Sequence, residues 1–313
     1  MTFIQYQLMT EGRCQYVAQT ETRLELGCRS YEAAVMKDED RSALDRASAK
    51  RLRTVAGRHN ARLKELRLAF RRSQLTEQGE CAIDGLKLIE EAIRHGQHLT
   101  SVFFSESARP LAEKLLPQVS ERTEILVLPP ALFKSIVPSE SPQGVAALVK
   151  LKPCSAVQVL DRSHGGPFVV ACGVQDPGNL GTILRSADAF GAAGVFLAEG
   201  TVSPYNSKVL RGSAGSIFRV PFAQVSSGEL IPTLRRNGVR LLGTSSHKGT
   251  PLPEAKWVLP LAIFIGNEGS GLPREILHQM DELLVIPQTA SVESLNAGVA
   301  TSIILYETLR RQK

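Results

Sequence analysis

The chain has 313 residues, of which 43% are hydrophobic and 22% are charged, close to the averages for soluble globular proteins. This composition excludes a wholly disordered, collagen-like or coiled-coil chain, and at roughly 150 residues per domain the length predicts about two domains. Lys and Arg number 37 against 31 Asp and Glu, and the resulting net charge of +6 mildly favours an acidic partner such as nucleic acid.

The cysteines and the N-terminus narrow the class further. The five cysteines are scattered and contain no C-x-x-C pair, which argues against a disulfide scaffold or a bound metal. The N-terminus lacks the basic and apolar regions of a signal peptide, and no apolar run approaches the ~18 residues that span a bilayer. We therefore expect a soluble, cytoplasmic protein without a metal site.

The first 47 residues show no sustained periodicity, so we expect residues 1–47 to form a poorly ordered extension. From Leu52 onwards, apolar residues recur every three or four positions, which predicts an amphipathic helix. The residues of this stripe are Leu52, Val55, His59, Leu63, Leu66 and Phe70. Between Arg51 and Arg72 the segment carries eight basic residues against one Glu, which leaves the rest of the chain nearly neutral. The segment is either a solvated helix face or a phosphate-binding surface.

Helical and strand patterns then alternate over residues 80–150. The predicted helices cover 85–95, 108–116 and 131–136, and the predicted strands cover 101–104, 124–127 and 144–149. Prolines and the segment Asp161–Pro167 place a linker at residues 153–166. Residues 48–152 are therefore expected to form a basic helix and a small α/β domain.

The C-terminal part, residues 167–313, alternates apolar strands with helices. The strands are expected at 168–174, 195–197, 239–243, 261–265 and 283–286, and helices are expected to start near Asn179, Asn206, Gly228, Pro273 and Leu295. Buried strands alternating with helices predict a parallel sheet covered on both faces. Ligands in such sheets bind at the carboxyl ends of the strands.

Two loops in this part carry residues suited to ligand binding. In Asp176–Gly191, a turn leads into a helix that Asn179 is placed to cap, and Arg185 follows nearly two turns later. A capped helix is ordinary by itself, but a guanidinium here suits bidentate contact with phosphate. Gly266–Leu272 follows an apolar strand, and its glycines permit close approach of a ligand to the backbone. Glu268 either pairs with Arg185 or favours the N-terminus of the following helix.

A third loop, Ile286–Ala300, leads into the last helix. We expect Ser294 or a neighbour to cap that helix, and Ser294 and Asn296 lie at its first turn, where they can converge on a ligand. The chain contains neither G-x-G-x-x-G nor G-x-x-x-x-G-K-[ST], so a dinucleotide or triphosphate site is poorly supported.

Together the three loops resemble the signature motifs of the SpoU (TrmH-like) family of RNA ribose 2′-O-methyltransferases, in the SPOUT superfamily. The matching positions are Asn179, Gly181, Arg185 and Ala187; Gly266–Gly269 with Gly271 and Leu272; and Ile286, Pro287, Ser294–Asn296 and Ala300. Arg211–Gly215 resembles the family's basic small-residue stretch, and residues 75–150 resemble its small N-terminal substrate-binding domain. The sequence departs from the pattern at Gln288, where methionine is common, and residues 1–47 have no counterpart.

The resemblance implies an α/β fold: a C-terminal parallel-sheet domain with a deep trefoil knot, plus the small N-terminal α/β domain. It implies S-adenosylmethionine as cofactor, bound by Gly266, Ile286 and Leu295. It also implies a reaction site built from Asn179, Arg185, Glu268, Ser294 and Asn296. Because an arginine stays protonated, we expect Arg185 to orient the ribose and its phosphate, with Glu268 fixing the guanidinium.

RNA is the implied substrate, ribosomal RNA more than tRNA. The candidate RNA-binding residues are Arg58, Arg62, Arg67 and Arg211. A homodimer is also implied, through one side of the last helix, with packing inside the monomer as the alternative for the apolar residues Leu295, Val299, Ile303, Tyr306 and Leu309. Two other functions are less well supported by the sequence. A nucleotide-dependent oxidoreductase would need a glycine fingerprint that is missing here, and a non-catalytic RNA-binding protein predicts damaged motifs.

Overall fold

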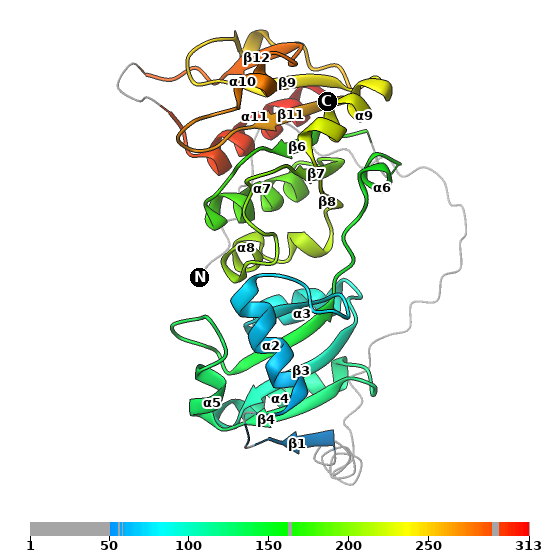
Figure 1. Cartoon of the computed structure of the whole chain (residues 1–313), viewed down its shortest axis with the longest axis vertical. Coiled ribbons are helices and arrows are strands. Elements are labelled where there is room, and N and C mark those ends of the chain that lie inside the picture. Colours follow the sequence, from blue (N-terminus) through cyan, green and yellow to red (C-terminus); the bar gives the residue numbers. More distant parts are fainter. Residues whose placement is uncertain (1–50, 56, 58, 162–164, 290–293, 313) are drawn as a thin grey trace, which may run out of the picture. The chain divides into compact units, whose positions relative to one another are not determined.

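The computed structural model describes residues 51–55, 57, 59–161, 165–289 and 294–312. The predictions for residues 1–47 and for Arg58 lie outside this part of the chain. The described residues form two α/β domains, each built on its own sheet (Figure 1). Across these residues, no helix combines the length and the apolar character needed to cross a membrane.

The N-terminal domain contains a five-stranded sheet in the order β1-β4-β3-β5-β2. β5 is antiparallel to β2 and β3, and the other pairs are parallel. The strands are β1 (Leu52–Thr54), β2 (Glu80–Asp84), β3 (Leu99–Ser105), β4 (Glu124–Leu128) and β5 (Val145–Lys150). The helices α3 (Leu86–Arg94), α4 (Arg109–Leu115) and α5 (Pro130–Lys134) confirm the three predicted here, and β2 is an additional strand.

The basic helix begins later than its apolar spacing predicted. α2 (Ala61–Arg72) starts after Asn60, whose Oδ1 accepts a hydrogen bond from the Leu63 N–H at 3.2 Å. The prediction of a helix from Leu52 was wrong, because residues 52–54 instead pair with β4 as an edge strand. The asparagine cap is the stronger start signal, since its side chain satisfies an N–H group of the first turn. α2 and α5 pack on one face of the sheet, around Phe103 and Leu126.

The C-terminal domain has a seven-stranded sheet in which all pairs are parallel, which confirms the predicted parallel sheet. The order is β10-β12-β9-β11-β6-β7-β8. The strands are β6 (Phe168–Ala171), β7 (Gly194–Leu197), β8 (Phe222–Gln224), β9 (Arg240–Thr244), β10 (Thr250–Pro251), β11 (Leu261–Ile265) and β12 (Glu282–Val285). The short strands β8 and β10, at the two edges, had not been predicted.

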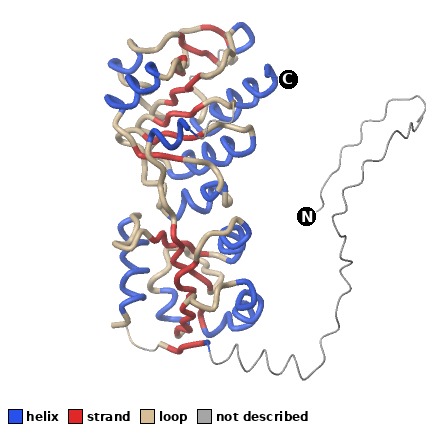
Figure 2. Tube along the Cα trace, turned by 90° about the vertical axis from the view of Figure 1, so that its right-hand side faces the viewer, coloured by secondary structure: helices blue, strands red, loops and turns tan. Residues whose placement is uncertain are grey.

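Helices cover both faces of this sheet, as Figure 2 shows. On one face lie α7 (Pro177–Ala189), α8 (Ser207–Ser213) and α11 (Ala297–Gln312), and on the other lie α6 (Ala156–Asp161), α9 (Ser227–Arg236) and α10 (Arg274–Leu277). Short 3₁₀ turns span Glu106–Ala108, Leu116–Gln118, Ser216–Phe218 and Leu252–Glu254. α6 lies inside the predicted linker, and its Val159 is fully buried against the sheet. The linker is therefore partly structured, because its apolar residues join the core.

The strand order creates a switch point between β6 and β11. From β6 the chain proceeds to β7 and β8 on one side, and then returns to β9 and β11 on the other. The loops that leave β6 and β11 therefore diverge at the carboxyl edge of the sheet, which is where open parallel sheets bind ligands. The knot that the resemblance implies stays a prediction.

Candidate active site

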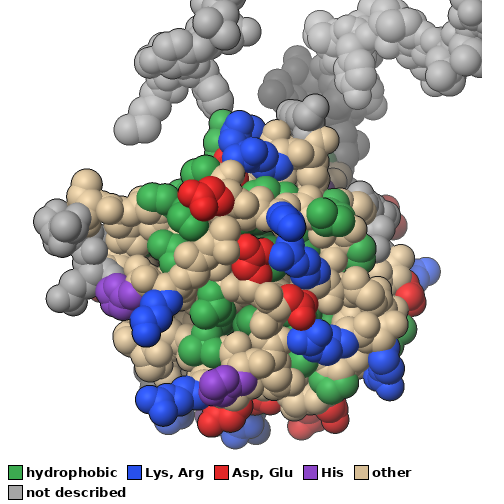
Figure 3. Space-filling model, turned by 90° about the horizontal axis from the view of Figure 1, so that it is seen from above, with side chains coloured by type: hydrophobic (Ala, Val, Ile, Leu, Met, Phe, Trp, Pro, Cys, Tyr) green, Lys and Arg blue, Asp and Glu red, His purple; other side chains and the backbone are tan. Residues whose placement is uncertain are grey.

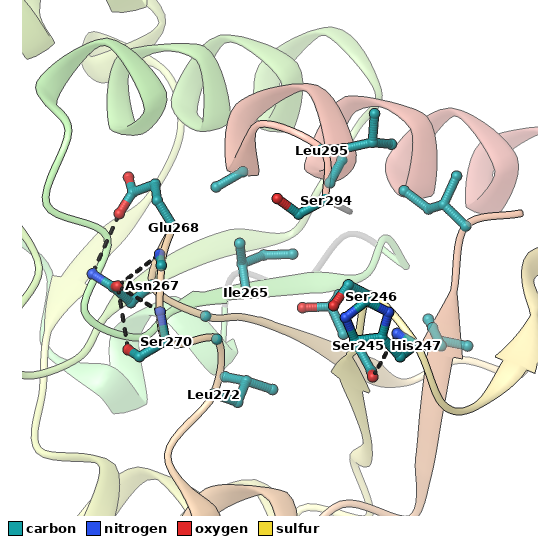
Figure 4. Close-up of a pocket in the computed structure, with 18 of the residues that line it drawn as sticks. Ser245, Ser246, His247, Ile265, Asn267, Glu268, Ser270, Leu272, Ser294 and Leu295 are labelled. Atoms are coloured by element: carbon teal, nitrogen blue, oxygen red, sulfur yellow. Dashed lines mark hydrogen bonds between the residues drawn. The ribbon is translucent and has the colours of Figure 1, made fainter. Parts of the chain in front are cut away.

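The loop after β11 is folded tightly back on itself. Gly266 is buried, and a Cβ atom there would lie 2.3 Å from the carbonyl carbon of Gly271, so no side chain fits. Asn267 and Gly271 exchange two backbone hydrogen bonds of 3.0 Å. The Asn267 Oδ1 also accepts from the N–H groups of Gly269 and Ser270, at 2.9 and 3.1 Å (Figure 4). These bonds present the loop backbone as a fixed surface at the end of the strand.

The loop after β6 begins helix α7 with a cap other than the predicted one. Asp176 is the N-cap, and its Oδ1 accepts from the Asn179 N–H at 2.8 Å. The prediction that Asn179 caps the helix was wrong. Pro177 takes the first helical position, which its fixed φ angle favours. Because Asp176 satisfies the free N–H group, the Asn179 side chain is available for other contacts.

A chain of hydrogen bonds joins the three predicted motifs. The Asn296 Nδ2 donates to the Asn179 Oδ1 at 2.6 Å, and the Asn179 Nδ2 donates to the Glu268 Oε1 at 2.8 Å. The Asn296 Oδ1 accepts from the Val299 N–H at 3.1 Å, so Asn296, the neighbour of Ser294, caps the last helix. Residues from the loops after β6, β11 and β12 are thereby held in one arrangement.

Glu268 is fixed by the backbone as well as by this chain. Its carboxylate accepts from the N–H groups of Gln175 and Asp176, both at 3.2 Å. Burial acts to raise the pKa of Glu268, but the hydrogen bonds from Asn179 and the backbone outweigh it, and the pKa lies below its ordinary value. The expected pair between Glu268 and Arg185 was wrong, because the carboxylate is used by these other donors.

Arg185 is left free by this arrangement. Its side chain is exposed and makes no hydrogen bond or ion pair with any described residue. The next residue, Ser186, lies in the seam between α7 and α11, where its hydroxyl and that of Ser302 are joined at 2.7 Å. One turn earlier on α7, Thr182 packs so closely on Gly298 that a Cβ there would lie 2.9 Å from it. These contacts fix α7, the helix that carries the exposed Arg185.

A cavity of about 370 Å³ lies beside the hydrogen-bonded chain, at the carboxyl ends of β12, β9 and β11 (Figure 4). The three predicted cofactor-binding residues, Gly266, Ile286 and Leu295, all line it, together with Ser294 and Glu268. The remaining lining residues are Thr244–His247, Ile265, Asn267, Gly269–Leu272, Leu277, Leu284, Gln288, Ala297, Ala300 and Ile304.

Sequence reasoning missed two parts of this cavity. The loop Thr244–His247 follows β9, and β9 ends at the same edge of the sheet as β11. The signal was a Ser-Ser-His sequence directly after an apolar strand. Gln288 was noted only as a departure from the family pattern, yet its Oε1 is buried in the structure and has no hydrogen-bond partner. Both parts contribute polar groups to an otherwise largely aliphatic end of the cavity.

The predicted RNA-binding arginines differ in their surroundings. Arg62 is held by two carboxylates, with Nη2 3.1 Å from the Glu80 Oε1 and Nη1 2.6 Å from the Glu65 Oε2. Its pKa is raised, because the hydrogen bonds to these carboxylates outweigh the opposing effect of burial. Arg211 contacts Asp84 at 2.9 Å. Arg62 is therefore part of the domain's internal structure, and Arg211 is already paired.

Arg67 differs from both, because it has no partner among the described residues. Other basic residues of the chain are paired on the surface. Figure 3 shows side chains of both charge signs interspersed on one face of the molecule. Within the C-terminal domain, Arg235 lies 3.1 Å from Asp281 and Arg310 lies 2.7 Å from Glu307. Such a mixed surface does not favour phosphate binding.

Metal ligation and thiol chemistry find little support in the part of the chain that the structure describes. No group of three or more His, Cys, Asp or Glu side chains there is placed to hold a metal ion. Cys172 is buried behind the glycine loop, and burial raises the pKa of its thiol to about 12. A reactive thiolate at this position is therefore disfavoured.

Comparison with known proteins gives matches over most of the chain. Residues 166–306 match the model of the SpoU rRNA Methylase family, and residues 60–147 match an MRM3-like substrate binding domain. A 23S rRNA (uridine(2479)-2′-O)-methyltransferase of Streptomyces viridochromogenes is 32% identical, over 83% of this chain and 94% of its own. A 23S rRNA (guanosine(2553)-2′-O)-methyltransferase of Bacillus subtilis is 28% identical, over 82% of this chain and 98% of its own.

Solved structures agree with these matches. The AdoMet-bound rRNA methyltransferase from Sinorhizobium meliloti superposes with a TM-score of 0.72 at 26% identity, over 84% of this chain and 99% of its own. The SpoU methyltransferase AviRb from Streptomyces viridochromogenes, in complex with AdoMet, superposes with a TM-score of 0.70 at 30% identity. That match covers 81% of this chain and 98% of the other.

Proposed function

The chain belongs to the SpoU rRNA methylase family and is an S-adenosylmethionine-dependent RNA 2′-O-methyltransferase, and we propose that it methylates ribosomal RNA with its residues divided as follows. The main evidence is the series of hydrogen bonds that links Asn296, Asn179 and Glu268, beside a cavity lined by Gly266 and Ile286. A non-catalytic RNA-binding protein would have no need to keep these hydrogen bonds intact.

The cavity suits a nucleoside without phosphates. Its volume, about 370 Å³, lies within the usual range for small-molecule sites. Aliphatic side chains such as Ile286 and Leu295 offer apolar walls, and the backbone of the loop after β11 offers N–H and C=O groups. The described residues that line the cavity include no lysine or arginine, so this lining fits S-adenosylmethionine better than a nucleotide cofactor.

The cofactor supplies a methyl group already activated on a positively charged sulfur, so the protein needs no nucleophile of its own. What remains for the protein is to hold the ribose hydroxyl in line with that group and to exclude other geometries. We assign this positioning to Arg185, whose free guanidinium can bind a ribose or phosphate oxygen, and to Asn179. Glu268 fixes the amide of Asn179, and Ser294 and Asn296 shape the wall between the ribose and the cofactor.

RNA binding is proposed to use one stripe of α2. Lys64, Arg67 and Arg71 are spaced i, i+3, i+7, so they lie on one side of the helix. None has a hydrogen-bond or ion-pair partner among the described residues, and Lys64 and Arg71 are exposed. Arg62, one of the RNA-binding residues predicted from the sequence, is not part of this basic stripe, because its guanidinium is paired with Glu80.

A homodimer is proposed through α11. Val299, Ile303 and Tyr306 form an exposed apolar stripe on this helix, and they are 46%, 37% and 55% exposed. The opposite side of α11 is buried, and its Ala297, Ala300 and Ile304 line the cavity, which would place the partner next to the cofactor site. Exposed apolar surface of this kind is typical of an interface. An enzyme that modifies ribosomal RNA works where ribosomes are assembled, so we also propose a cytoplasmic location.

The proposed substrate is tested by methyl transfer in vitro. Purified protein and S-adenosyl[methyl-³H]methionine are incubated with unmodified 23S rRNA, 16S rRNA and bulk tRNA from a strain that lacks the gene. We expect tritium in rRNA, on a ribose 2′-oxygen, and the phosphodiester bond that follows this ribose should resist alkaline cleavage. Tritium in tRNA alone would refute the rRNA substrate, and tritium in a base would refute ribose methylation.

A further inference from the structure

The Oε1 atom of Gln288 is a buried acceptor without a donor. The residue lines the cavity, and this oxygen has no hydrogen-bond partner among the described residues. Leaving an amide oxygen unsatisfied costs about 1–3 kcal/mol, so such atoms call for an explanation. A ligand that brings a donor into the cavity would satisfy the oxygen.

The strand order locates Gln288 at one end of the cavity. Gln288 follows β12, Ser245–His247 follow β9, and Glu268 follows β11, and these strands are consecutive neighbours in the sheet. With about 4.8 Å between neighbouring strands, the end of β12 lies roughly 10 Å from the end of β11. Gln288 therefore lies at the end of the cavity away from the hydrogen-bonded pair Glu268 and Asn179.

The lining at this end is aliphatic apart from Gln288 and the loop Ser245–His247. Leu284 is 1% exposed and Ile304 is 1% exposed, and both line the cavity with Ile286 and Ala300. Such walls disfavour the charged ammonium and carboxylate of an amino acid, and they suit a flat, uncharged heterocycle. The methyl group must lie near that hydrogen-bonded pair, so the adenine ring is the part of the cofactor that fits here.

We propose that the Gln288 side-chain amide reads the 6-amino group of the cofactor's adenine, an inference that rests on the proposed function. The exocyclic amine is the N–H donor on the ring, and the Oε1 of Gln288 is the acceptor without a partner. The Nε2 of the same amide can donate to a neighbouring ring nitrogen, the two-point geometry by which glutamine recognises adenine elsewhere. A methionine here would offer only a weak sulfur acceptor, so this contact distinguishes the chain from relatives with that residue.

The test measures binding rather than catalysis. Calorimetry gives the Kd of S-adenosylhomocysteine and of its 6-deamino analogue, in which hydrogen replaces the amino group, for the wild type and for Q288M. We expect the wild type to prefer the amino compound, and Q288M to lose about 3- to 10-fold of that preference, the value of one neutral hydrogen bond. Gln224→Met, the same change at an exposed glutamine of the edge strand β8 outside the cavity, is the matched control and should keep the preference.

Unfolding of the ligand-free protein gives a second readout. Because Q288M removes an unsatisfied buried oxygen, its midpoint of thermal unfolding without ligand should be equal to or above that of the wild type. Equal affinity of the wild type for both compounds would overturn the proposal even if Q288M did not fold. An unchanged preference in folded Q288M would do the same. If the wild type bound neither compound, the cofactor site itself would be refuted, which is a distinguishable result.

Discussion

Arg185 and Glu268 show how the surroundings of a residue determine its use. Both were expected in one ion pair, but the carboxylate accepts from Asn179 and two backbone N–H groups instead. Arg185 is exposed on α7 and has no hydrogen-bond or ion-pair partner among the described residues. A free guanidinium on the helix that also carries Asn179 is suited to an external anion, and here the candidate is the RNA backbone.

Replacing Arg185 should separate catalysis from cofactor binding. In R185A we expect methyl transfer to fall by about 100-fold or more, because the ribose loses its orientation, while the Kd for S-adenosylhomocysteine changes by less than about threefold. R185K keeps the charge but lacks the two-point geometry, so its rate should lie between the two. Methyl-transfer assays and calorimetry measure the two quantities, and a fully active R185A would contradict the assignment.

Glu268 should contribute to a pH dependence of stability. Its pKa in the folded protein lies below the ordinary value of 4.5, so its stabilising effect is complete above about pH 4.5 and is lost as the pH falls through the lowered folded value. E268Q cannot titrate, so its free energy of unfolding should decline less than that of the wild type between pH 5 and about pH 3. Urea titrations at several pH values check this. Parallel curves for both proteins would show that Glu268 has an ordinary pKa.

At the scale of elements, α2 divides its basic residues between two tasks. Arg62 turns inward to Glu80, which is 2% exposed. Lys64 and Arg71 are exposed and Arg67 is half-buried, and none of the three has a partner among the described residues. The hydrophobic spacing of the helix was visible in the sequence, and so was its charge. The sequence did not show which arginine turns inward, because Glu80 is 18 residues away from Arg62 on a strand that no pattern had predicted.

The two groups on α2 should respond differently to substitution. R62A leaves Glu80 buried without its cation and should lower the free energy of unfolding by about 2–4 kcal/mol. R67A, its matched control, should change stability by less than about 0.5 kcal/mol. Chemical denaturation measures both, and equal losses would contradict the assigned division.

The basic stripe of Lys64, Arg67 and Arg71 should carry a measurable part of the salt dependence of RNA binding. With all three changed to Ala, the slope of log K against log salt should become about 2 units shallower, since each phosphate contact contributes about 0.7–0.9. Filter binding at several salt concentrations gives the slope. If the triple variant kept the wild-type slope, the stripe would be only a solvated helix face.

Helix α11 has one side on the cavity and one side exposed. Changing Ile303 and Tyr306 to Glu should convert a dimer into a monomer, because two charges would then lie in an apolar interface. Light scattering after size exclusion should show a mass near 34.0 kDa for the variant and twice that for the wild type. Val258→Glu, at an exposed apolar residue elsewhere, is the control. A monomeric wild type would contradict the proposed interface.

For the whole molecule, local patterns predicted most elements and the tertiary contacts decided the rest. The alternation of apolar strands with helices predicted the parallel sheet. The resemblance to the SpoU family implied Gly266, Ile286 and Leu295 as cofactor-binding residues, and all three line the cavity. Edge strands such as β1 and β8 are three residues long, too short to carry a period. The cap at Asp176 went unpredicted because two cap-forming residues, Asp176 and Asn179, stand three positions apart, and in the structure Asn179 contacts Glu268 instead.

The measurement that tests the central claim most directly is a comparison of ribose methylation in ribosomal RNA with and without the gene. RNA from the parent strain, a deletion strain and the deletion strain complemented with R185A is mapped for bonds that resist alkaline cleavage. We expect one or more resistant rRNA bonds in the parent that are missing from the deletion strain and are not restored by R185A. Identical rRNA maps in the parent and deletion strains would contradict an rRNA 2′-O-methyltransferase.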